Sequence, residues 1–444
     1  MRIAVYGIGN NFIRNYKWIA RRYEICVLVD GSPGKQGTDF QGIPVQAPTV
    51  LRDKTYDKIL VTPNAHLEIV NILLNENVPP ENIIYLNDIL PSDDVGKELR
   101  IAFRVTGGLG DALIALNYID AFHKNFGARH IRIYLETVSG RNGFTALIPE
   151  DSFFAAIQEA ADDETRHGEY HLYIRVQRYP EVLYADTARI ARLAPELIDY
   201  IQLCEKFRIF NPRFFEKDFV ADGESAALEE LQGRKRIMQP DIYGRFRLSE
   251  EYGFRLRVSQ EVLKKFGLKA NEYISIHRGT EEKNYFRTST KLWAIENYHS
   301  LFRLLEERYP GFPLVLVGAD YEKDEGLNFQ GMDLVGKTTL PELAMIVGGS
   351  RVHIDTEGGV VHLRHAVSGK PSAVIFGPTS DRFFGYGENE NIRSNACPYP
   401  CEWVSMDWNR LCIRGESAPP CMVGVTPQTV LKAVERILAF TDEE

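Results

Sequence analysis

The sequence has no long apolar run and no excess of basic residues, and each absence excludes a class of protein. None of its apolar stretches reaches the roughly 18–20 residues that a membrane-spanning helix needs. Its 61 acidic residues outnumber its 52 basic residues, which gives a net charge of -9. Because nucleic-acid backbones bind basic surfaces, this balance argues against a protein that coats DNA or RNA. A small basic pocket for one diphosphate remains compatible with it.

No charged-then-apolar leader pattern is seen at the start, so we expect no secretory leader, and the sequence shows no internal repeat or low-complexity tract. It opens with MRIAVYGIGNNF, which predicts a strand running into a turn. We therefore expect a cytoplasmic protein, and leave open a peripheral association with the inner membrane. In that compartment the six cysteines are expected to be reduced.

Short β-type runs alternate with helical patterns along the whole chain, which is typical of α/β folds with parallel sheets. We expect three domains: a small Rossmann-like domain at 1–95, and two facing Rossmann-like domains at 96–255 and 256–444. A ligand would bind in the cleft between the last two, at the carboxyl ends of their strands. The segment around 234–253 is the predicted interdomain linker, and the final helix is expected to pack back across the pair.

The first domain carries an incomplete dinucleotide fingerprint. Its predicted strands are Ile3–Tyr6, Ile25–Val29, Ile59–Val61 and Ile83–Leu86. The turn after the first strand contains Gly7 and Gly9, but Phe12 stands where the third small residue belongs. Asp30 ends the second strand at about the right distance to bind a ribose. The domain is thus either a nucleotide-binding unit or a docking unit.

A second glycine turn, TGGLGDAL, joins a strand to a helix near residue 107. Gly107, Gly108 and Gly110 allow a sharp turn and leave room for a ligand. Asp111 then projects from the first helical turn, where its carboxylate could take a proton from an attacking hydroxyl. The alternative is that Asp111 simply caps the helix. The helix dipole also opposes the first interpretation, because it weakens a carboxylate as a base.

A third turn of this kind occurs in HIDTEGGVVHLRHA. Gly358 and Gly359 are predicted to expose backbone amides at a helix N-terminus, which suits a diphosphate. Glu357 could accept hydrogen bonds from sugar hydroxyls, and His362 could donate one to a phosphate. The alternative is a tight turn with a packed histidine. His362 and His365 share a helix face, but two histidines alone rarely form a metal site.

Two further segments of the last region could contact a nucleotide. The loop IHRGTEEKNYFRTSTKLW offers Arg278, Thr280 and Lys291 after a strand, which suits phosphate binding, although a solvated charged loop fits as well. The stretch GKTTLPELA could line a nucleobase slot through Lys337 and Thr338. Its Thr339-x-x-Glu342 pattern is also an ordinary helix start.

Four of the six cysteines lie within 25 residues of one another near the C-terminus. Their spacing, C-x3-C-x10-C-x8-C, is looser than that of common zinc ribbons. Four thiolates in an irregular segment (397–421) suit a structural tetrahedral site for zinc or iron. Four unliganded thiols are the alternative. The residues concerned are Cys397, Cys401, Cys412 and Cys421.

Taken in order, GLGDALIAL, KLW, GKTTLPELA, EGGVVHL and SAVIFGPTSDRFFGYG resemble glycosyltransferase family 9, the ADP-heptose heptosyltransferases. The resemblance covers about residues 100–440 and is strongest over 274–385. It implies a GT-B fold, in which two Rossmann-like domains face each other, and an inverting sugar transfer that requires no metal. The leading domain is absent from the core family and resembles modules of sugar-modifying bacterial enzymes.

The resemblance also implies roles for individual residues. Asp111 falls where the family has its general base, and Lys291 and Thr280 fall in the loop that holds the donor phosphates. Glu357 and Gly358 replace the family's Asp and Ser or Thr, so the donor sugar is less certain than the reaction. The cysteine cluster resembles one that holds iron in autotransporter heptosyltransferases.

The expected activity is therefore transfer of a sugar from an ADP-heptose-like or other nucleotide-diphosphate-sugar to a hydroxyl of a glycan, lipid-linked or protein acceptor. No cofactor is expected for the transfer, no nucleic-acid partner is expected, and a homo-oligomer is left open. Two alternatives remain. One is an NAD-dependent or epimerase-like nucleotide-sugar enzyme, and the other is a non-catalytic scaffold built on a transferase fold.

Overall fold

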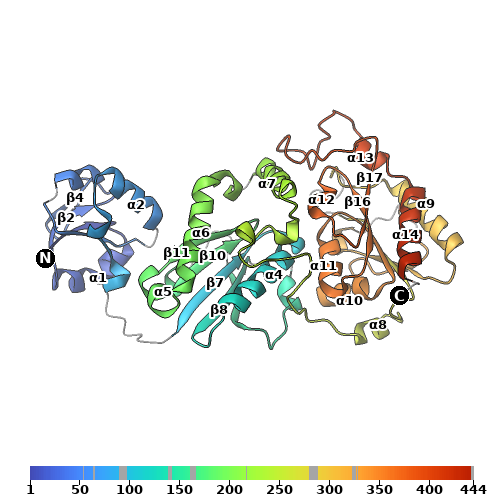
Figure 1. Cartoon of the computed structure of the whole chain (residues 1–444), viewed down its shortest axis with the longest axis horizontal. Helices are drawn as coiled ribbons and strands as arrows, with labels where there is room; N and C mark the ends of the chain where they lie inside the picture. Colours follow the sequence, from blue (N-terminus) through green and yellow to red (C-terminus); the bar gives the residue numbers. More distant parts are fainter. Residues whose placement is uncertain are drawn as a thin grey trace.

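The computed structural model contains three α/β units that follow one another along the chain (Figure 1). It describes all residues except 54, 64–65, 90–97, 139–142, 161–166, 217, 280–288, 323–326, 328 and 442–444. Within that described part, no helix is both long and apolar enough to cross a bilayer. Each unit has its own sheet, and this confirms the α/β class expected from the alternating pattern.

The first unit is a six-stranded sheet in the order β3-β4-β2-β1-β5-β6, parallel except for the β3–β4 pair. The four predicted strands are all present as short apolar runs; β1 and β5 are mostly buried, whereas the edge strand β6 is only partly buried and ends at Tyr85. Its elements are β1 (Arg2–Tyr6), α1 (Asn10–Ala20), β2 (Glu24–Val29), β3 (Asp39–Phe40), β4 (Ile43–Gln46), β5 (Lys58–Val61), α2 (His66–Asn75), β6 (Ile83–Tyr85) and α3 (Leu86–Ile89).

The second unit is a five-stranded sheet in the order β11-β10-β7-β8-β9, with β11 antiparallel to β10. The helical pattern before residue 210 is interrupted at Pro195 as expected, since proline removes an amide and clashes with the preceding turn. Its elements are β7 (Leu99–Val105), α4 (Leu109–Phe126), β8 (Ile131–Val138), β9 (Phe154–Ala160), β10 (Leu172–Val176), β11 (Pro180–Ala185), α5 (Thr187–Leu193), α6 (Glu196–Phe210) and α7 (Phe219–Leu231).

The third unit is a parallel six-stranded sheet in the order β14-β13-β12-β15-β16-β17. Its strands are β12 (Ile274–His277), β13 (Leu314–Val317), β14 (Met332–Asp333), β15 (Val352–Thr356), β16 (Ser372–Phe376) and β17 (Glu390–Arg393). Its helices are α8 (Glu261–Lys265), α9 (Ile295–Arg308), α10 (Leu340–Gly349), α11 (Gly359–Ser368), α12 (Asp381–Phe384), α13 (Pro420–Val423) and α14 (Pro427–Thr441).

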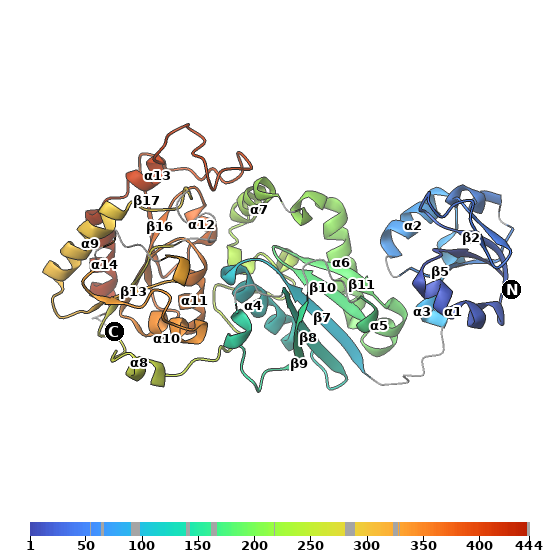
Figure 2. The same ribbon diagram turned by 180° about the vertical axis from the view of Figure 1, so that it is seen from behind.

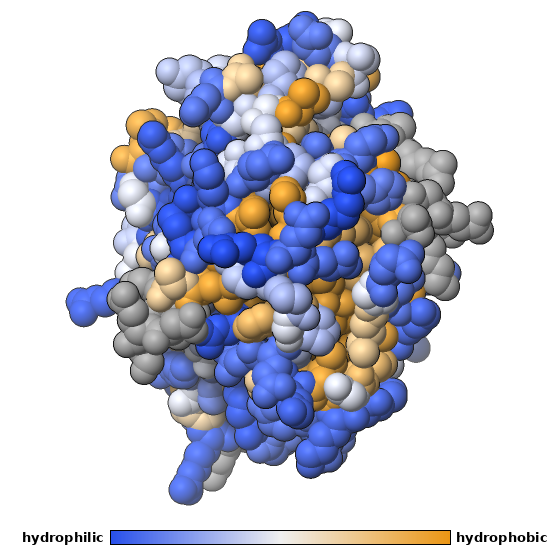
Figure 3. All heavy atoms as spheres, turned by 90° about the vertical axis from the view of Figure 1, so that its right-hand side faces the viewer, coloured by the Kyte–Doolittle hydropathy of each residue, from blue (hydrophilic) through white to orange (hydrophobic). Residues whose placement is uncertain are grey.

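The last helix, α14, packs on its own domain. It contacts α9, β15, β16 and β17, and its apolar residues Val430, Ala433, Val434 and Ile437 are buried in the core of the third unit. The expectation that this helix crosses back over both domains is therefore corrected. The end of the molecule that carries α9 and α14 is mostly polar on its surface, with small apolar areas between charged side chains (Figure 3).

The chain crosses from the second unit to the third between α7 and α8. We expected a linker around 234–253, and the segment does connect the units, but it is not a solvated loop. It contains two short 3-10 helices, Arg236–Met238 and Ile242–Gly244. Arg236, Ile237 and Gln239 are buried, because the segment packs against the start of α4.

Candidate functional site: two helix N-termini that meet between the domains

The first half of the site is the glycine turn between β7 and α4. Gly107 has a φ of +104°, a left-handed conformation that favours glycine, and a Cβ there would lie 2.5 Å from Oδ2 of Asp111. Asp111 folds back over this turn, and its Oδ2 accepts a hydrogen bond of 3.0 Å from the amide of Gly108. Asp111 therefore caps α4, which was the alternative to a catalytic role in the sequence analysis.

Capping uses one oxygen of Asp111, and an arginine from the connecting segment contacts the other. Nη2 of Arg236 lies 2.6 Å from Oδ1 of Asp111 and also donates to the carbonyl of Gln177 at 3.0 Å. The arginine side chain is 6% exposed and the Asp111 side chain 35% exposed, so one side of the carboxylate still faces solvent. A carboxylate has about four lone-pair positions, and the contacts with Gly108 and Arg236 occupy two of them.

Sequence analysis missed Arg236. The two paired residues are 125 positions apart, and the arginine lies in a segment that composition alone marks as a linker. Arg236 is 5% exposed, and its Nη1 has no hydrogen-bond partner within the described chain. The pair places a buried positive charge beside the carboxylate and fixes its orientation.

The second half of the site is the turn between β15 and α11. Gly358 is the N-cap of α11 and makes no side-chain cap, and no acidic residue lies in the first helical turn. The N-terminal amides of this helix are therefore without a counter-charge from their own turn. A helix end of this kind favours an anion such as a diphosphate.

The two turns meet, because α4 and α11 pack against each other at the boundary between the domains (Figures 1 and 2). A Cβ on Gly110 would lie 2.6 Å from Cδ2 of His362, and a Cβ on Gly359 would lie 3.1 Å from Cβ of Leu109. These two glycines therefore permit close approach of the two helices. The sequence suggests that they make room for a ligand or bind it, and it gives no sign of this contact between domains.

His362 lies on the buried face of this contact. Its Nδ1 is 2.6 Å from the hydroxyl of Tyr386. Burial, followed by the positive charge of Arg236, lowers the pKa of His362 to about 3, so the imidazole is neutral near pH 7. A neutral imidazole can donate one hydrogen bond and accept another.

His365, on the same face of α11, has a structural role. Its ring stacks on Tyr386 at 3.6 Å, Nδ1 contacts Glu388 at 2.5 Å and Nε2 contacts the carbonyl of Glu250 at 2.6 Å. No group of three metal-ligating side chains is found in the described residues, around His362 and His365 or elsewhere.

Glu357 and Lys291 form a buried ion pair beside the α11 turn. Nζ of Lys291 lies 2.6 Å from Oε2 of Glu357, and each side chain is 8% exposed. Thr379 also donates to that oxygen at 2.9 Å. The structure thus brings the two predicted donor contacts together, and it shows that each is engaged by protein groups.

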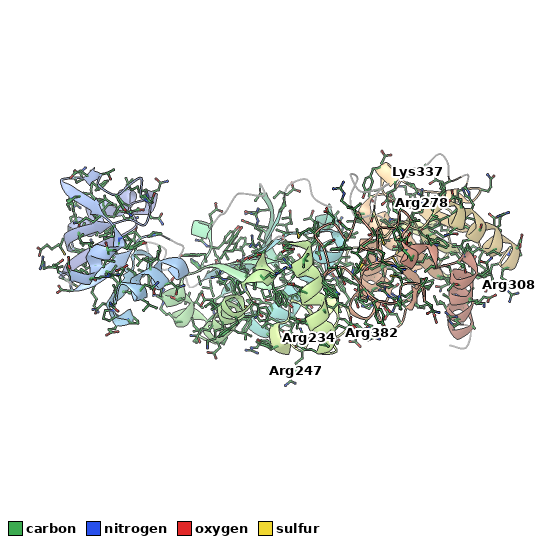
Figure 4. All side chains as sticks on the ribbon, turned by 90° about the horizontal axis from the view of Figure 1, so that it is seen from above. Arg234, Arg247, Arg278, Arg308, Lys337 and Arg382 are labelled. Atoms are coloured by element: carbon green, nitrogen blue, oxygen red, sulfur yellow. The ribbon has the colours of Figure 1, made fainter. Side chains whose placement is uncertain are left out.

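The remaining predicted donor contacts lie further along the same domain. The guanidinium of Arg278 stands 5.8 Å from the ring centre of Tyr298, and Thr280 lies outside the described residues. Lys337 is exposed and donates to the carbonyl of Asp333 at 2.7 Å, and Thr338 follows it in the same turn. Arg278 and Lys337 lie on one side of the domain, and Arg382 lies on the other (Figure 4).

Two segments of the chain match family models. Residues 243–404 match the model of glycosyltransferase family 9, described as heptosyltransferase. Residues 1–84 match a second model, described as C2185-like, N-terminal. No curated protein matches the chain.

Solved structures similar to this chain include two Escherichia coli proteins. The iron-containing dodecameric glycosyltransferase TibC of enterotoxigenic E. coli is 16% identical, with a TM-score of 0.50 and 78% of each chain covered. The E. coli ADP-heptose lipopolysaccharide heptosyltransferase II is 14% identical, with a TM-score of 0.49, and the match covers 78% of this chain and all of that one. The two facing domains that contain the family 9 match form a GT-B fold, as expected.

Outside the family 9 match, the N-terminal turn uses Asp30 in an unexpected way. Its carboxylate accepts from the amides of Ile8 at 2.8 Å and Ser32 at 2.9 Å, and it pairs with Lys35 at 3.0 Å. Asp30 therefore holds the Gly7–Gly9 turn against the second strand. The carboxylate that was expected to bind a ribose is engaged by the protein itself.

The family 9 match ends between the second and third cysteines of the cluster. All four thiols are free. Burial, followed by the neighbouring Cys421, Cys397 and Cys412, raises the pKa of Cys401 to about 12. Burial, followed by Cys397 and Cys412, likewise raises the pKa of Cys421 to about 11. The other cysteines thus lie close enough to Cys401 and Cys421 to disfavour the thiolate forms of these two, although no three described donors are arranged around a metal position.

Proposed function

We propose that the protein transfers a sugar, with inversion at the anomeric carbon, from a nucleotide-diphosphate-sugar to an acceptor hydroxyl. The observation that carries this proposal is the meeting of Asp111 with the uncapped N-terminus of α11. One side supplies a carboxylate and the other supplies an unfilled anion site. An inverting transfer needs these two groups on opposite sides of the reacting carbon.

In the proposed reaction, Asp111 accepts the proton of the acceptor hydroxyl through the part of its carboxylate that faces solvent. The hydroxyl oxygen forms a bond to the anomeric carbon as the bond from that carbon to the diphosphate breaks. The electron pair leaves with the nucleoside diphosphate. Amides at the start of α11, near Gly358 and Gly359, stabilise the charge that develops on this leaving group.

Arg236, Lys291 and Glu357 support this arrangement. Arg236 contacts one oxygen of Asp111 and fixes the orientation of the carboxylate. Lys291 stands beside the α11 turn and brings a positive charge close to the diphosphate position, while Glu357 holds it there. A heptose donor carrying ADP is our first candidate, since the matched family is described as heptosyltransferase. Arg278, Thr280, Lys337 and Thr338 are proposed as further donor contacts.

The test is Asp111→Asn, assayed by release of nucleoside diphosphate from a panel of nucleotide-sugars and an acceptor extract. Loss of the base should reduce turnover roughly 10²–10⁴-fold, while donor affinity stays within a few-fold. Asp120→Asn is the matched control, because Asp120 lies on the same helix and pairs with Lys124 at 2.6 Å. Near-normal turnover in Asp111→Asn would exclude this carboxylate as the base. The anomeric configuration of the product decides between inversion and retention.

We also propose that the four cysteines of 397–421 hold a structural metal, zinc or iron. The four thiols are free and lie near one another, the pKa values of Cys401 and Cys421 are raised, and a bound cation would offset the cost of deprotonating these two. TibC is described as iron-containing. Elemental analysis of the purified protein should find about one metal atom per chain, and Cys401→Ser with Cys421→Ser should lose it. A metal-free native protein would contradict the proposal.

A further inference from the structure

The N-terminal domain contains a cavity of about 580 Å³ that the proposed transfer does not use. Its walls come from the carboxyl ends of β1, β2 and β5, the start of α1 and one face of α2. β1 lies between β2 and β5 in the parallel sheet, so the cavity opens where the strand order reverses. Ligands of open parallel sheets bind at this position.

One end of the cavity is formed by the N-terminus of α1, which nothing in its own turn neutralises. The N-cap Gly9 makes no side-chain hydrogen bond, and the first turn contains no acidic residue. The N-terminus of a helix carries about half a positive charge. The nearby Asp30 and Lys35 compensate each other in an ion pair of 3.0 Å. The cavity therefore retains a positive end that suits an anion.

The hydroxyl of Tyr6 is a second polar group on the cavity wall that could bind a ligand. Its side chain lines the cavity and only 3% of the residue is exposed, yet its hydroxyl has no hydrogen-bond partner in the described chain. Because Tyr6 lines the cavity, its hydroxyl is placed to donate a hydrogen bond to a ligand oxygen there. Burial and then the Asp30 carboxylate raise the pKa of Tyr6, so the hydroxyl keeps the proton that it would donate.

Neither the backbone conformation nor the packing around Gly9 requires a glycine at this position. Its φ of -108° suits any residue, and a Cβ there would meet no atom within 4 Å. The absent side chain leaves the amides at the start of α1 open to close approach from the cavity. Pro63, Ile69 and Ile72 also line the cavity and provide an apolar surface against which a planar base can pack.

We propose that this cavity binds a mononucleotide, with a phosphate at the N-terminus of α1 and the base against the apolar wall of α2. The dinucleotide mode is disfavoured, because the Asp30 carboxylate that would accept the ribose hydroxyls already receives two amides and Lys35. The site is separate from the transfer cleft and does not depend on the proposed function.

The first experiment is hydrogen exchange on the full chain, with AMP, ADP, UMP, UDP, NAD⁺ and inorganic phosphate as probes. A mononucleotide should slow exchange in peptides covering 6–12 and 30–35, and inorganic phosphate should do so only at higher concentration. Protection confined to 105–112 and 355–363 would place the nucleotide in the transfer cleft alone and overturn the proposal. Protection by NAD⁺ stronger than by any mononucleotide would overturn the choice of ligand.

The second experiment uses Asn10→Asp, which separates binding from folding. An acidic residue in the first turn stabilises a helix but repels a phosphate, so the variant should melt no lower than the native protein and bind at least tenfold more weakly. Asn10→Gln is the neutral control and should bind normally. Tyr6→Phe removes only the hydroxyl and should weaken binding about fivefold. Unchanged affinity in Asn10→Asp would exclude a phosphate at this helix end.

Asp111→Asn keeps the two proposals distinguishable. It should leave protection of 6–12 unchanged while it abolishes turnover. Loss of turnover without protection of 6–12 would sustain the transferase proposal and reject the nucleotide site. Protection without turnover in the native protein would do the reverse.

Discussion

The turn before α1 and the turn before α4 have the same backbone form, but different groups lie at the two helix ends. Each follows a buried parallel strand, contains glycine at a positive φ and begins a helix. At α4 the helix end is capped by Asp111, and Gly110 lies against His362 of the next domain. At α1 the helix end has no cap, and Gly9 borders open space. One turn has become a domain contact, whereas the other keeps the form of a ligand site.

This difference shows that a glycine turn does not by itself reveal its use. What distinguishes the two turns is the residue that follows the glycines. Asp111 brings a negative charge to the helix end, and Asn10 does not. The predictions below compare matched changes at the two turns.

The largest difference is expected from valine in place of Gly110 and of Gly9. At Gly110 a Cβ would lie 2.6 Å from the buried ring of His362, which is fixed by its bond to Tyr386. Overpacking of this kind costs about 3 kcal/mol. Gly9→Val should cost less than about 1 kcal/mol, mainly through the preference for the N-cap position. Domain-resolved hydrogen exchange measures both, and equal costs would remove the contrast between the turns.

A smaller difference is expected from removing the cation at each turn. Arg236→Met leaves Asp111 without its buried partner and should destabilise the domain contact by about 2 kcal/mol, reduced from the value for a fully buried pair because Asp111 is partly exposed. Lys35→Met should cost only about 0.5 kcal/mol, since the Lys35 side chain is 46% exposed. Thermal unfolding followed by calorimetry reports both. A larger effect at Lys35 would mean that the N-terminal turn depends more on its ion pair.

The smallest difference is expected in how the stability of the two turns changes with pH. The pKa of His362 is about 3 in the folded state and near 6.5 when unfolded, so unfolding takes up a proton between these values. The domain contact should weaken by about 1–2 kcal/mol from pH 7 to pH 5. Although burial raises the pKa of Asp30, hydrogen bonds from Ser32, Ile8 and Lys35 lower it overall. Its stabilisation is present above pH 3.8 and lost only below.

Hydrogen exchange at pH 7 and pH 5, corrected for the intrinsic rate, should therefore show loss of protection at α11 and none at α1. His362→Gln, which cannot be protonated, is the control and should flatten the response at α11. An equal loss at both helices would contradict the assignment.

Much of the fold could be predicted from the sequence, because its determinants are local. Short apolar runs gave the strands, and a proline marked the break between α5 and α6. The three glycine turns were located correctly for the same reason. Their partners were not, because Arg236 reaches Asp111 across 125 positions and Lys291 reaches Glu357 from another strand's loop. Gly110 and Gly359 are needed for the packing of α4 against α11. A contact between two domains produces no periodic pattern in the sequence from which it could be predicted.

Asp30 shows the limit most clearly. Its position at the end of β2 was correctly located, but its function depends on the nearby Lys35 and on two backbone amides. A residue type at the right spacing specifies what could bind, whereas the neighbours decide whether it is available. The identity of the ligand was therefore beyond sequence reasoning at this turn.

The position of Arg236 has a mechanical consequence. The arginine belongs to the chain that crosses between the domains, and its partner Asp111 belongs to one of them. Arg236 is held in the second domain by Asp111 and Gln177, whereas the preceding residue, Lys235, donates to the carbonyl of Gly385 in the third domain at 2.9 Å. Two adjacent residues are thus anchored to different domains, and a rotation between the domains would place its strain on the backbone next to the partner of Asp111.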